Sequence, residues 1–329
     1  MVIKHTDLPR LTSATNNAIV TIERKQTVIS PSFQRRHFSF IFLVVVGICT
    51  VAKFIHLNLN HCSTGLPRQE VRRLPQAIII GARKCGTRAL LEFLNLHPLI
   101  ESARYETHYF DNLSNYKLGL EWYRDQLPLT RPGQITIEKT PGYFTRQPVP
   151  YRMYQFNPEL KLILILRDPV TRTISDYTQV HVSRSARGIP DSSLAALAFT
   201  PDGELNSRYK PIRNSLYHKH LRNWLLYFPL RSIHIVDGEQ FIIDPISILR
   251  TVETFLELPH AISEQQLYYN ASKGFYCFRQ EPEDVGTCLG ETKGRTHVKV
   301  PTWVRSKLQR LYRPHNQRLY QMIGRQLSW

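Results

Sequence analysis

The stretch QAIIIGARKCGTRALLEFLNLHP, residues 76–98, decides the fold of this 329-residue chain. Its apolar run from Ala77 to Ile80 indicates a buried strand, and the leucines of the segment RALLEFL recur at helical spacing. A glycine-containing loop, Gly81 to Thr87, joins the two. A loop of this kind directs backbone N–H groups and the start of a helix at one point, which favours a bound anion there.

Two cations mark this loop, Lys84 within it and Arg88 at the start of the helix. The loop that binds nucleoside triphosphates places its lysine directly before a Ser or Thr that holds magnesium. Here Lys84 lies in the middle of the loop, and Thr87 follows Gly86 directly. Any proposed ligand has to explain why the lysine lies at this position. The alternative to an anion site is an ordinary βα turn that binds no ligand.

The composition favours a polyanionic partner, because 43 Lys and Arg stand against 26 Asp and Glu, a net charge of +17. Nucleic acid, an acidic glycan or a membrane surface would fit. Five cysteines without paired C-x-x-C spacing exclude a disulfide-stapled scaffold and a zinc ribbon. Cys277 and Cys288 lie close enough in sequence to close a short loop, which needs an oxidising compartment.

An N-terminal membrane anchor is predicted from the apolar run that begins at Phe38. With its continuation beyond Lys53 the run spans residues 38–57, about 20 residues, the length of a spanning helix. The basic cluster before it places residues 1–37 in the cytosol. A cleaved signal peptide and a buried soluble helix are the alternatives. Residues 58–74 form a stem, and residues 75–329 form one lumenal domain.

Strands and helices alternate beyond residue 74, which predicts an α/β fold with a right-handed parallel sheet flanked by helices. Strands are expected at 77–80, 134–138, from Lys161 and at 232–236, and helices at 116–127, from Pro169, at 214–228, through 246–256 and at the C-terminus. The segments LYYNA and GFYCF, from Leu267 on, predict a short antiparallel C-terminal hairpin.

Glu106 and His108 are a candidate acid–base pair, because a spacing of two places both on one face of an extended segment. A carboxylate and an imidazole that point into a cleft suit proton abstraction from a hydroxyl. An ordinary hydrogen-bonded pair is the alternative. Asp111 could orient a basic group nearby.

Arg167 and Ser175 are a candidate phosphate site at the carboxyl end of the second apolar strand, where open α/β sheets bind ligands. The alternatives are an ion pair of Arg167 with Asp168, and a magnesium-holding strand that ends in Asp168. The turn from Lys293 to His297 is a third cationic segment, and a solvated loop is its alternative.

Eight segments in order resemble the heparan sulfate glucosamine 3-O-sulfotransferases: GARKCGTRALLEFLNLHP, ETHYFDN, IEKTPGYF, LILILRDPVTRTISDYTQV, SLYHKHLRNWLLYFP, HIVDGEQF, KGFYCFR and KGRTHVKV. The resemblance covers essentially all of residues 75–329. It implies a P-loop-like fold and the donor 3′-phosphoadenylyl sulfate. That donor has no γ-phosphate, so no metal-holding Ser or Thr and no catalytic metal are required, which accounts for the position of Lys84.

The resemblance also implies a role for each matching residue. The loop residues expected to hold the 5′-phosphosulfate are Lys84, Cys85, Gly86, Thr87 and Arg88. Those expected to contact the 3′-phosphate or other parts of the donor are Arg167, Ser175, Tyr276, Lys293, Gly294, Arg295, Thr296 and His297. On the acceptor side Glu106 would be the general base, His108 would assist it, and Asp111 and Lys139 would lie near the sugar. Lys84 would also stabilise charge on the leaving oxygen.

The remaining implications concern location and partners. Cys277 and Cys288 match the family disulfide, and sequons at Asn112 and Asn270 are candidate glycosylation sites. The expected location is the Golgi membrane, in a single-pass type II arrangement. Heparan sulfate is the expected polyanionic partner, because a lumenal domain would not meet nucleic acid.

The sequence departs from the family at two places. Cys85 stands where the family usually has glycine, and its side chain could crowd the phosphosulfate or face solvent. Residues 181–205 match poorly, which leaves the preferred saccharide open. Three alternatives remain: a sulfotransferase for another glycan position, a nucleotide-binding kinase or hydrolase, and a non-catalytic binder of acidic glycans.

Overall fold

The computed structural model describes residues 70–281, 283–290 and 296–329. The predicted cytoplasmic tail, membrane-spanning helix and most of the stem lie outside these residues. Among the helices of the described ranges, none combines the length and apolar character needed to cross a membrane. Strand β1 (Val71–Arg72) pairs antiparallel with β4 (Leu129–Thr130), so the last residues of the predicted stem belong to the folded domain.

A five-stranded parallel sheet forms the centre of the domain, in the order β3-β5-β2-β6-β7. The strands are β2 (Ala77–Gly81), β3 (Ile100–Ser102), β5 (Ile135–Lys139), β6 (Lys161–Leu166) and β7 (Ile233–Asp237). Every residue of β2 and all of β6 except Lys161 are buried. This burial explains their continuous apolar runs, since parallel sheets are covered on both faces.

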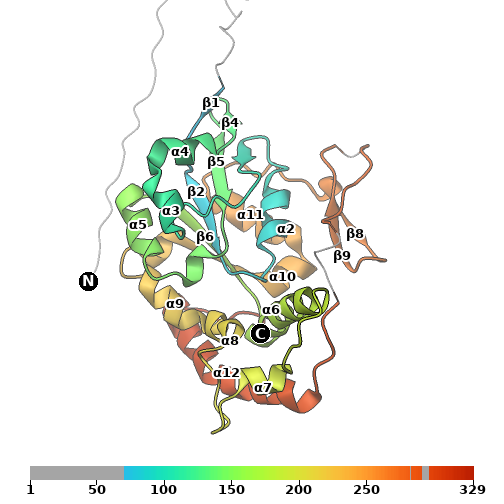
Figure 1. The fold of residues 1–329 in the computed structure, drawn as a ribbon. Coiled ribbons are helices and arrows are strands. Elements are labelled where there is room, and N and C mark those ends of the chain that lie inside the picture. Colours follow the sequence, from blue (N-terminus) through green and yellow to red (C-terminus); the bar gives the residue numbers. More distant parts are fainter. Residues whose placement is uncertain (1–69, 282, 291–295) are drawn as a thin grey trace, which may run out of the picture. The chain divides into compact units, whose positions relative to one another are not determined.

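Helices flank this sheet on both sides (Figure 1). On one side lie α3 (Leu113–Lys117), α4 (Gly119–Asp125) and α5 (Val149–Phe156), and on the other α2 (Thr87–Leu94), α10 (Gly238–Ile243) and α11 (Pro245–Phe255). Short 3₁₀ turns, η1 (Tyr143–Thr145), η2 (Leu230–Ser232) and η3 (Glu264–Gln266), lie in the connections. The predicted α/β architecture is therefore confirmed.

A second group of helices surrounds a separate apolar cluster below the sheet in Figure 1. It comprises α6 (Pro169–Ser185), α7 (Leu194–Ala198), α8 (Lys210–Ser215) and α12 (Thr302–Ile323). Helix α9 (Tyr217–Trp224) instead buries Tyr217, Leu221 and Trp224 in the core around the sheet. The poorly matched segment 181–205 contains α7, whose Leu194 and Ala198 are buried in this cluster.

Helix α6 begins where the sequence predicts, at Pro169. The Asp168 carboxylate accepts hydrogen bonds from the backbone N–H groups of Val170 (3.2 Å) and Thr171 (3.0 Å) and so caps the helix. Proline suits the first helical position, because the N–H it lacks would have no partner there. Asp168 therefore has a structural role at the end of β6.

Three helix predictions need correction. The helix expected at 116–127 is two helices, α3 and α4, because Gly119 adopts a positive φ of 84° at the start of α4. The helix expected at 214–228 is α8 and α9, separated by Leu216 at φ −84° and ψ 63°, outside the helical region. The described C-terminal residues form one helix, α12, in which Pro314 removes one backbone donor without dividing it.

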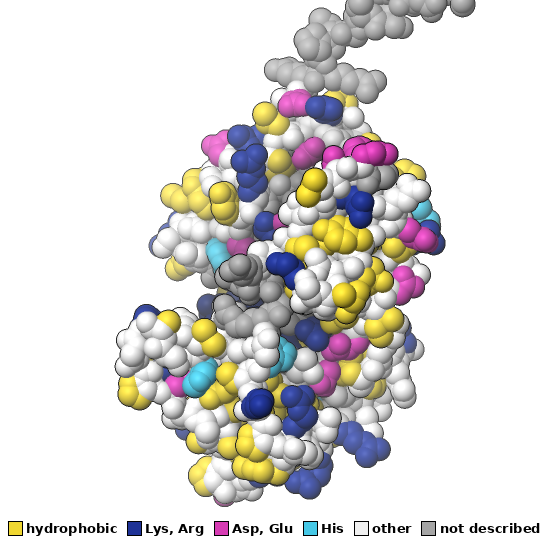
Figure 2. Space-filling view, turned by 90° about the vertical axis from the view of Figure 1, so that its right-hand side faces the viewer, with side chains coloured by type: hydrophobic (Ala, Val, Ile, Leu, Met, Phe, Trp, Pro, Cys, Tyr) yellow, Lys and Arg dark blue, Asp and Glu magenta, His cyan; other side chains and the backbone are white. Residues whose placement is uncertain are grey.

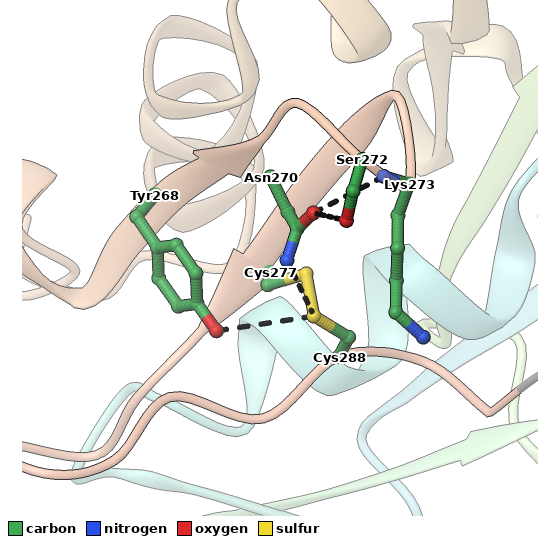
Figure 3. Close-up of a disulfide and its surroundings, with 6 residues drawn as sticks. All are labelled: Tyr268, Asn270, Ser272, Lys273, Cys277 and Cys288. Carbon is green, nitrogen blue, oxygen red and sulfur yellow. Dashed lines mark hydrogen bonds between the residues drawn. A yellow bond between two sulfur atoms is a disulfide. The ribbon is translucent and has the colours of Figure 1, made fainter.

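The predicted hairpin is present as β8 (Leu267–Asn270) and β9 (Phe275–Phe278), which pair antiparallel. Figure 3 shows the disulfide between Cys277 and Cys288, which ties the hairpin to the following segment. The side-chain oxygen of Asn270 accepts hydrogen bonds from Ser272 and Lys273, and its Nδ2 lies 3.7 Å from the sulfur of Cys288. The other sequon residue, Asn112, is exposed and caps α3.

We expect removal of the disulfide in a Cys277→Ala, Cys288→Ala variant to lower the free energy of unfolding by about 3 kcal/mol. The bond joins residues 11 apart, and a loop of this size restricts the unfolded chain by about that amount. Denaturant unfolding of the variant and of the oxidised parent measures the difference. The reduced parent is the control and should match the variant, whereas equal stability of variant and oxidised parent would contradict the expectation.

Candidate active site

The candidate site lies where β2 and β6 adjoin in the sheet. The chain leaves β2 toward β3 at one edge and leaves β6 toward β7 at the other. Such a switch in direction opens a crevice at the carboxyl ends of the strands. A cleft of about 610 Å³ lies there, bordered by the loop after β2 and by Arg167 after β6. The fold thus brings the first two predicted anion sites together.

The loop after β2 depends on two glycines. Gly86 precedes α2 with φ 99°, a conformation that favours glycine, and no side chain caps the first turn of the helix. A Cβ on Gly238 would lie 2.6 Å from the carbonyl oxygen of Leu166 and 3.3 Å from that of Cys85. Only glycine therefore lets α10 approach the ends of the two strands.

The side chains of Lys84 and Arg88 both line the cleft. Lys84 Nζ donates a hydrogen bond to Gln179 Oε1 at 3.0 Å, and Arg88 pairs with Glu92 at 2.5 Å along α2. The two cations therefore stand beside the uncapped start of α2. This arrangement suits a phosphate or phosphosulfate group.

The side chain of Cys85 turns into the core. It is 1% exposed, and its sulfur lies 3.6 Å from the hydroxyl of Tyr217, which donates a hydrogen bond to the Arg167 carbonyl oxygen at 2.9 Å. Burial raises the pKa of the Cys85 thiol. The expectation that this side chain faces solvent is therefore wrong, and crowding of the phosphosulfate stays a prediction.

Arg172 supports the loop from beneath and was not singled out in the sequence. Its fully buried guanidinium donates to the Arg83 carbonyl oxygen (3.2 Å), to Ser215 Oγ (2.6 Å) and to Asp176 Oδ2 (3.1 Å). It thus joins the loop, α6 and α8. Nothing in the sequence distinguishes this arginine from a solvent-facing one on a helix.

Arg167 and Ser175 line the same cleft, as predicted. The guanidinium of Arg167 pairs with Glu239 of α10, Nε to Oε1 at 3.2 Å, so the alternative pair with Asp168 is wrong. Tyr276 and His297 also line the cleft. Thr296 is exposed and lies outside the lining, and Lys293, Gly294 and Arg295 lie outside the described residues. Burial, followed by the charges of Arg167 and Lys84, lowers the pKa of His297.

Glu106, His108, Asp111 and Lys139 form a connected set on the other side of the β2 loop. Lys139 Nζ donates to Glu106 Oε1, and His108 Nε2 lies 3.5 Å from Glu106 Oε2. His108 Nδ1 lies 3.0 Å from Asp111 Oδ1, which fixes the ring with Nε2 toward Glu106. The predicted extended segment is wrong, because His108 has φ 49° and the chain bends there. The bend nevertheless brings the two side chains together.

A buried carboxyl group, Glu138, lies behind this set. It accepts hydrogen bonds from Thr107 Oγ1 (3.3 Å), the Tyr123 hydroxyl (3.3 Å) and Thr140 Oγ1. Burial raises its pKa from 4.5 to about 7, although the three hydroxyl donors and Lys139 oppose the shift. Because Thr107 lies between the candidate base and its histidine, Glu138 anchors their segment. The sequence signal that could have indicated this buried carboxyl group is the acid in the otherwise apolar strand segment IEKT.

Lys and Arg side chains are unevenly distributed over the face that carries the hairpin (Figure 2). Acidic side chains lie mainly in the upper and middle parts of that view, and basic ones predominate in the lowest part. On this face the basic side chains are therefore concentrated in the lowest part, a clustering that the sequence alone could not show.

Comparisons with known proteins match most of the chain to one family. The sulfotransferase domain family matches residues 74–327. Heparan sulfate glucosamine 3-O-sulfotransferase 5 of Mus musculus is 49% identical over 260 residues, which cover 79% of this chain and 75% of the relative. Heparan sulfate glucosamine 3-O-sulfotransferase 6 of Mus musculus is 44% identical over 279 residues, 83% of this chain and 80% of the relative.

A sulfotransferase of Alicyclobacillus acidocaldarius has a similar structure, with a TM-score of 0.55 and 20% identity. The superposition covers 78% of this chain and 98% of that one. At this identity the likeness concerns the fold alone.

We expect a Glu138→Gln variant to change the pH dependence of stability. Between about pH 4.5 and pH 7 the folded chain keeps a proton on Glu138 that the unfolded chain has released, so the free energy of unfolding falls as pH rises. Glutamine removes this titration. As pH rises from about 5 to about 7.5, the free energy of unfolding of the variant should increase by roughly 2 to 3 kcal/mol relative to that of the parent. Denaturant unfolding across this range is the measurement.

The control for that comparison is Glu121→Gln, which alters an exposed carboxylate on α4. If the stability profiles of the Glu138→Gln variant and the parent run parallel over this pH range, Glu138 does not hold a proton in the folded state.

Proposed function

This chain belongs to the sulfotransferase family, and we propose that it transfers a sulfuryl group from 3′-phosphoadenylyl sulfate to the 3-hydroxyl of glucosamine in heparan sulfate. The relatives named for this reaction match most of the chain. The observation that carries the proposal is the cleft itself. It places a carboxylate held by a lysine and a histidine on one side and a cationic phosphate cradle on the other.

The cradle fits a phosphosulfate donor. The uncapped first turn of α2 supplies N–H groups, and Lys84 and Arg88 supply positive charge beside it. Arg167 and Ser175 suit the 3′-phosphate, as an arginine fork and a hydroxyl donor. When bound, the donor supplies an activated sulfuryl group. Lys84 is the residue that we assign to the negative charge that develops on the leaving oxygen.

On the acceptor side, Glu106 would take the proton of the sugar 3-hydroxyl. Lys139 donates a hydrogen bond to one oxygen of this carboxylate and so holds it beside the acceptor part of the cleft. His108, oriented by Asp111, directs its Nε2 at the second oxygen. The bend at His108 and the hydroxyl network of Glu138 hold the base in place, so positioning contributes to the rate.

The same proposal includes the location of the protein. We propose a type II Golgi membrane protein anchored at residues 38–57, with a lumenal catalytic domain. The disulfide Cys277–Cys288 supports an oxidising compartment. The exposed Asn112 supports glycosylation at that sequon. At Asn270 a glycan on Nδ2 would replace the contact of this atom with Cys288.

We expect a Glu106→Gln variant to lower kcat by about 10²- to 10⁴-fold, because the amide cannot accept the hydroxyl proton. The assay measures transfer of labelled sulfate to heparan sulfate, with disaccharide analysis of the product to identify the position. Glu121→Gln is the matched control and should keep full activity, and both variants should keep the melting temperature of the parent.

Two outcomes would count against the proposed function. If the parent transfers no sulfate to any glycosaminoglycan, the chain is a binder rather than an enzyme. If product analysis finds the label at another position, the chain is a sulfotransferase with a different acceptor specificity. Retained activity of Glu106→Gln would assign the base to another residue.

We expect a Cys85→Gly variant to bind the donor product adenosine 3′,5′-bisphosphate no more tightly than the parent, because the thiol is buried beside the Tyr217 hydroxyl. The variant should lose about 1 to 2 kcal/mol of unfolding free energy through the lost packing and the greater freedom of glycine in the unfolded chain. Calorimetric titration and denaturant unfolding measure the two effects. An affinity gain of about tenfold or more would show that Cys85 crowds the ligand.

A further inference from the structure

A second hollow adjoins the candidate active site. It has a volume of about 840 Å³ and lies between residues 144–148 and the face of α8 and α9. Three residues, Thr145, Arg146 and Arg213, line both this groove and the catalytic cleft. The two hollows are therefore neighbouring parts of one depression, and a chain-like ligand could pass from one into the other.

The groove meets the cleft on the side of the candidate base. Lys139, which contacts Glu106, is followed along the chain by Pro141, Gly142 and Thr145, all of which line the cleft. The same segment continues into the wall of the groove at Gln147 and Pro148. A ligand whose hydroxyl meets Glu106 would thus find the groove along the wall that positions Lys139.

The groove is positively charged. Arg146, Arg213, Lys219 and Arg222 line it, and all four are exposed. No Asp or Glu is among its lining residues in the described part of the chain, and no described carboxylate lies within ion-pair distance of these four cations. The surrounding sequence continues the pattern, since residues 205–236 contain six Lys or Arg and no Asp or Glu.

The walls of the groove are fastened to each other. Asn223 Nδ2 donates to the Gln147 carbonyl oxygen at 3.1 Å, and Trp224 Nε1 donates to the Phe144 carbonyl oxygen at 3.0 Å. His220 Nε2 donates to the Arg213 carbonyl oxygen at 2.9 Å, and its ring packs edge-on against Phe144. The cations therefore project from a rigid scaffold, which lowers the entropic cost of binding.

We propose that this groove is an extension of the acceptor site, which binds anionic sugar residues of the polysaccharide beyond the residue that reacts. The inference rests on the proposed function. Its support is the charge of the groove, its continuity with the cleft and its position on the side of Glu106. A linear polymer of sulfated and carboxylated sugars matches a run of exposed cations without carboxylates.

The test compares long heparan sulfate with a short oligosaccharide acceptor that fills only the catalytic cleft. In a Lys219→Gln, Arg222→Gln variant of the full chain, KM for the long acceptor should rise about five- to thirtyfold, since each exposed ion pair contributes up to about a factor of five. The kcat for the long acceptor and both constants for the short acceptor should stay unchanged. Raised salt should reduce the difference between variant and parent.

Two control variants make the test specific. Arg231→Gln with Arg310→Gln removes the same charge from exposed positions that line neither hollow, and it should leave both KM values unchanged. Lys219→Arg with Arg222→Lys keeps the charges and should restore most of the affinity for the long acceptor. If the neutral variants at the groove and at the control positions behave alike, or if KM rises equally for both acceptors, the proposal is overturned.

A binding measurement separates this proposal from the proposed function. Salt elution from immobilised long heparan sulfate needs no turnover, so it tests the groove even if the parent proves inactive. The Lys219→Gln, Arg222→Gln variant should elute at lower salt than the Arg231→Gln, Arg310→Gln control. Equal elution of the two variants would overturn the proposal that the groove binds the acceptor. The proposal would also be overturned if the Lys219→Gln, Arg222→Gln variant loses binding to duplex nucleic acid or anionic vesicles but keeps its binding to heparan sulfate.

Discussion

The adjacency of β2 and β6 is the constraint on which the rest of the site depends. Because their connections leave toward opposite edges of the sheet, both strands end at an open crevice. The absence of a side chain at Gly238 then allows α10 to lie against both strand ends. The phosphate cradle, Arg167 and the donor-side residues take their positions from this single point of the fold.

Each half of the cleft rests on a buried ionisable residue. Arg172 lies beneath the loop of the donor side and binds its backbone, together with a hydroxyl and a carboxylate. Glu138 lies behind the acceptor side and is surrounded by hydroxyl groups. Buried polar groups of this kind fix a unique arrangement only when their partners are complete. The two halves are thus positioned by separate networks.

The sequence predicted those parts of the fold that follow from local patterns. The apolar runs at Ala77 and Lys161 marked buried strands, and the alternation of strands and helices gave a parallel sheet. Local patterns could not reveal the breaks at Gly119 and Leu216, because a single backbone conformation decides them. Most of the residues predicted for the site line the cleft, but the reason for the Glu106–His108 contact, a bend rather than an extended segment, was not predicted. The orientation of Cys85, the burial of Arg172 and the groove all depend on contacts between distant segments.

Helix α9 faces two ways. On its inner side Tyr217 contacts Cys85 and the Arg167 backbone, and on its outer side Lys219 and Arg222 line the groove. A single short helix thus carries one surface tied to the donor half and another open to solvent. Substitutions on the outer surface need not disturb the inner one, so the preference for a partner could drift during evolution while the chemistry stayed the same. The division between a fixed and a variable face is built into eight residues.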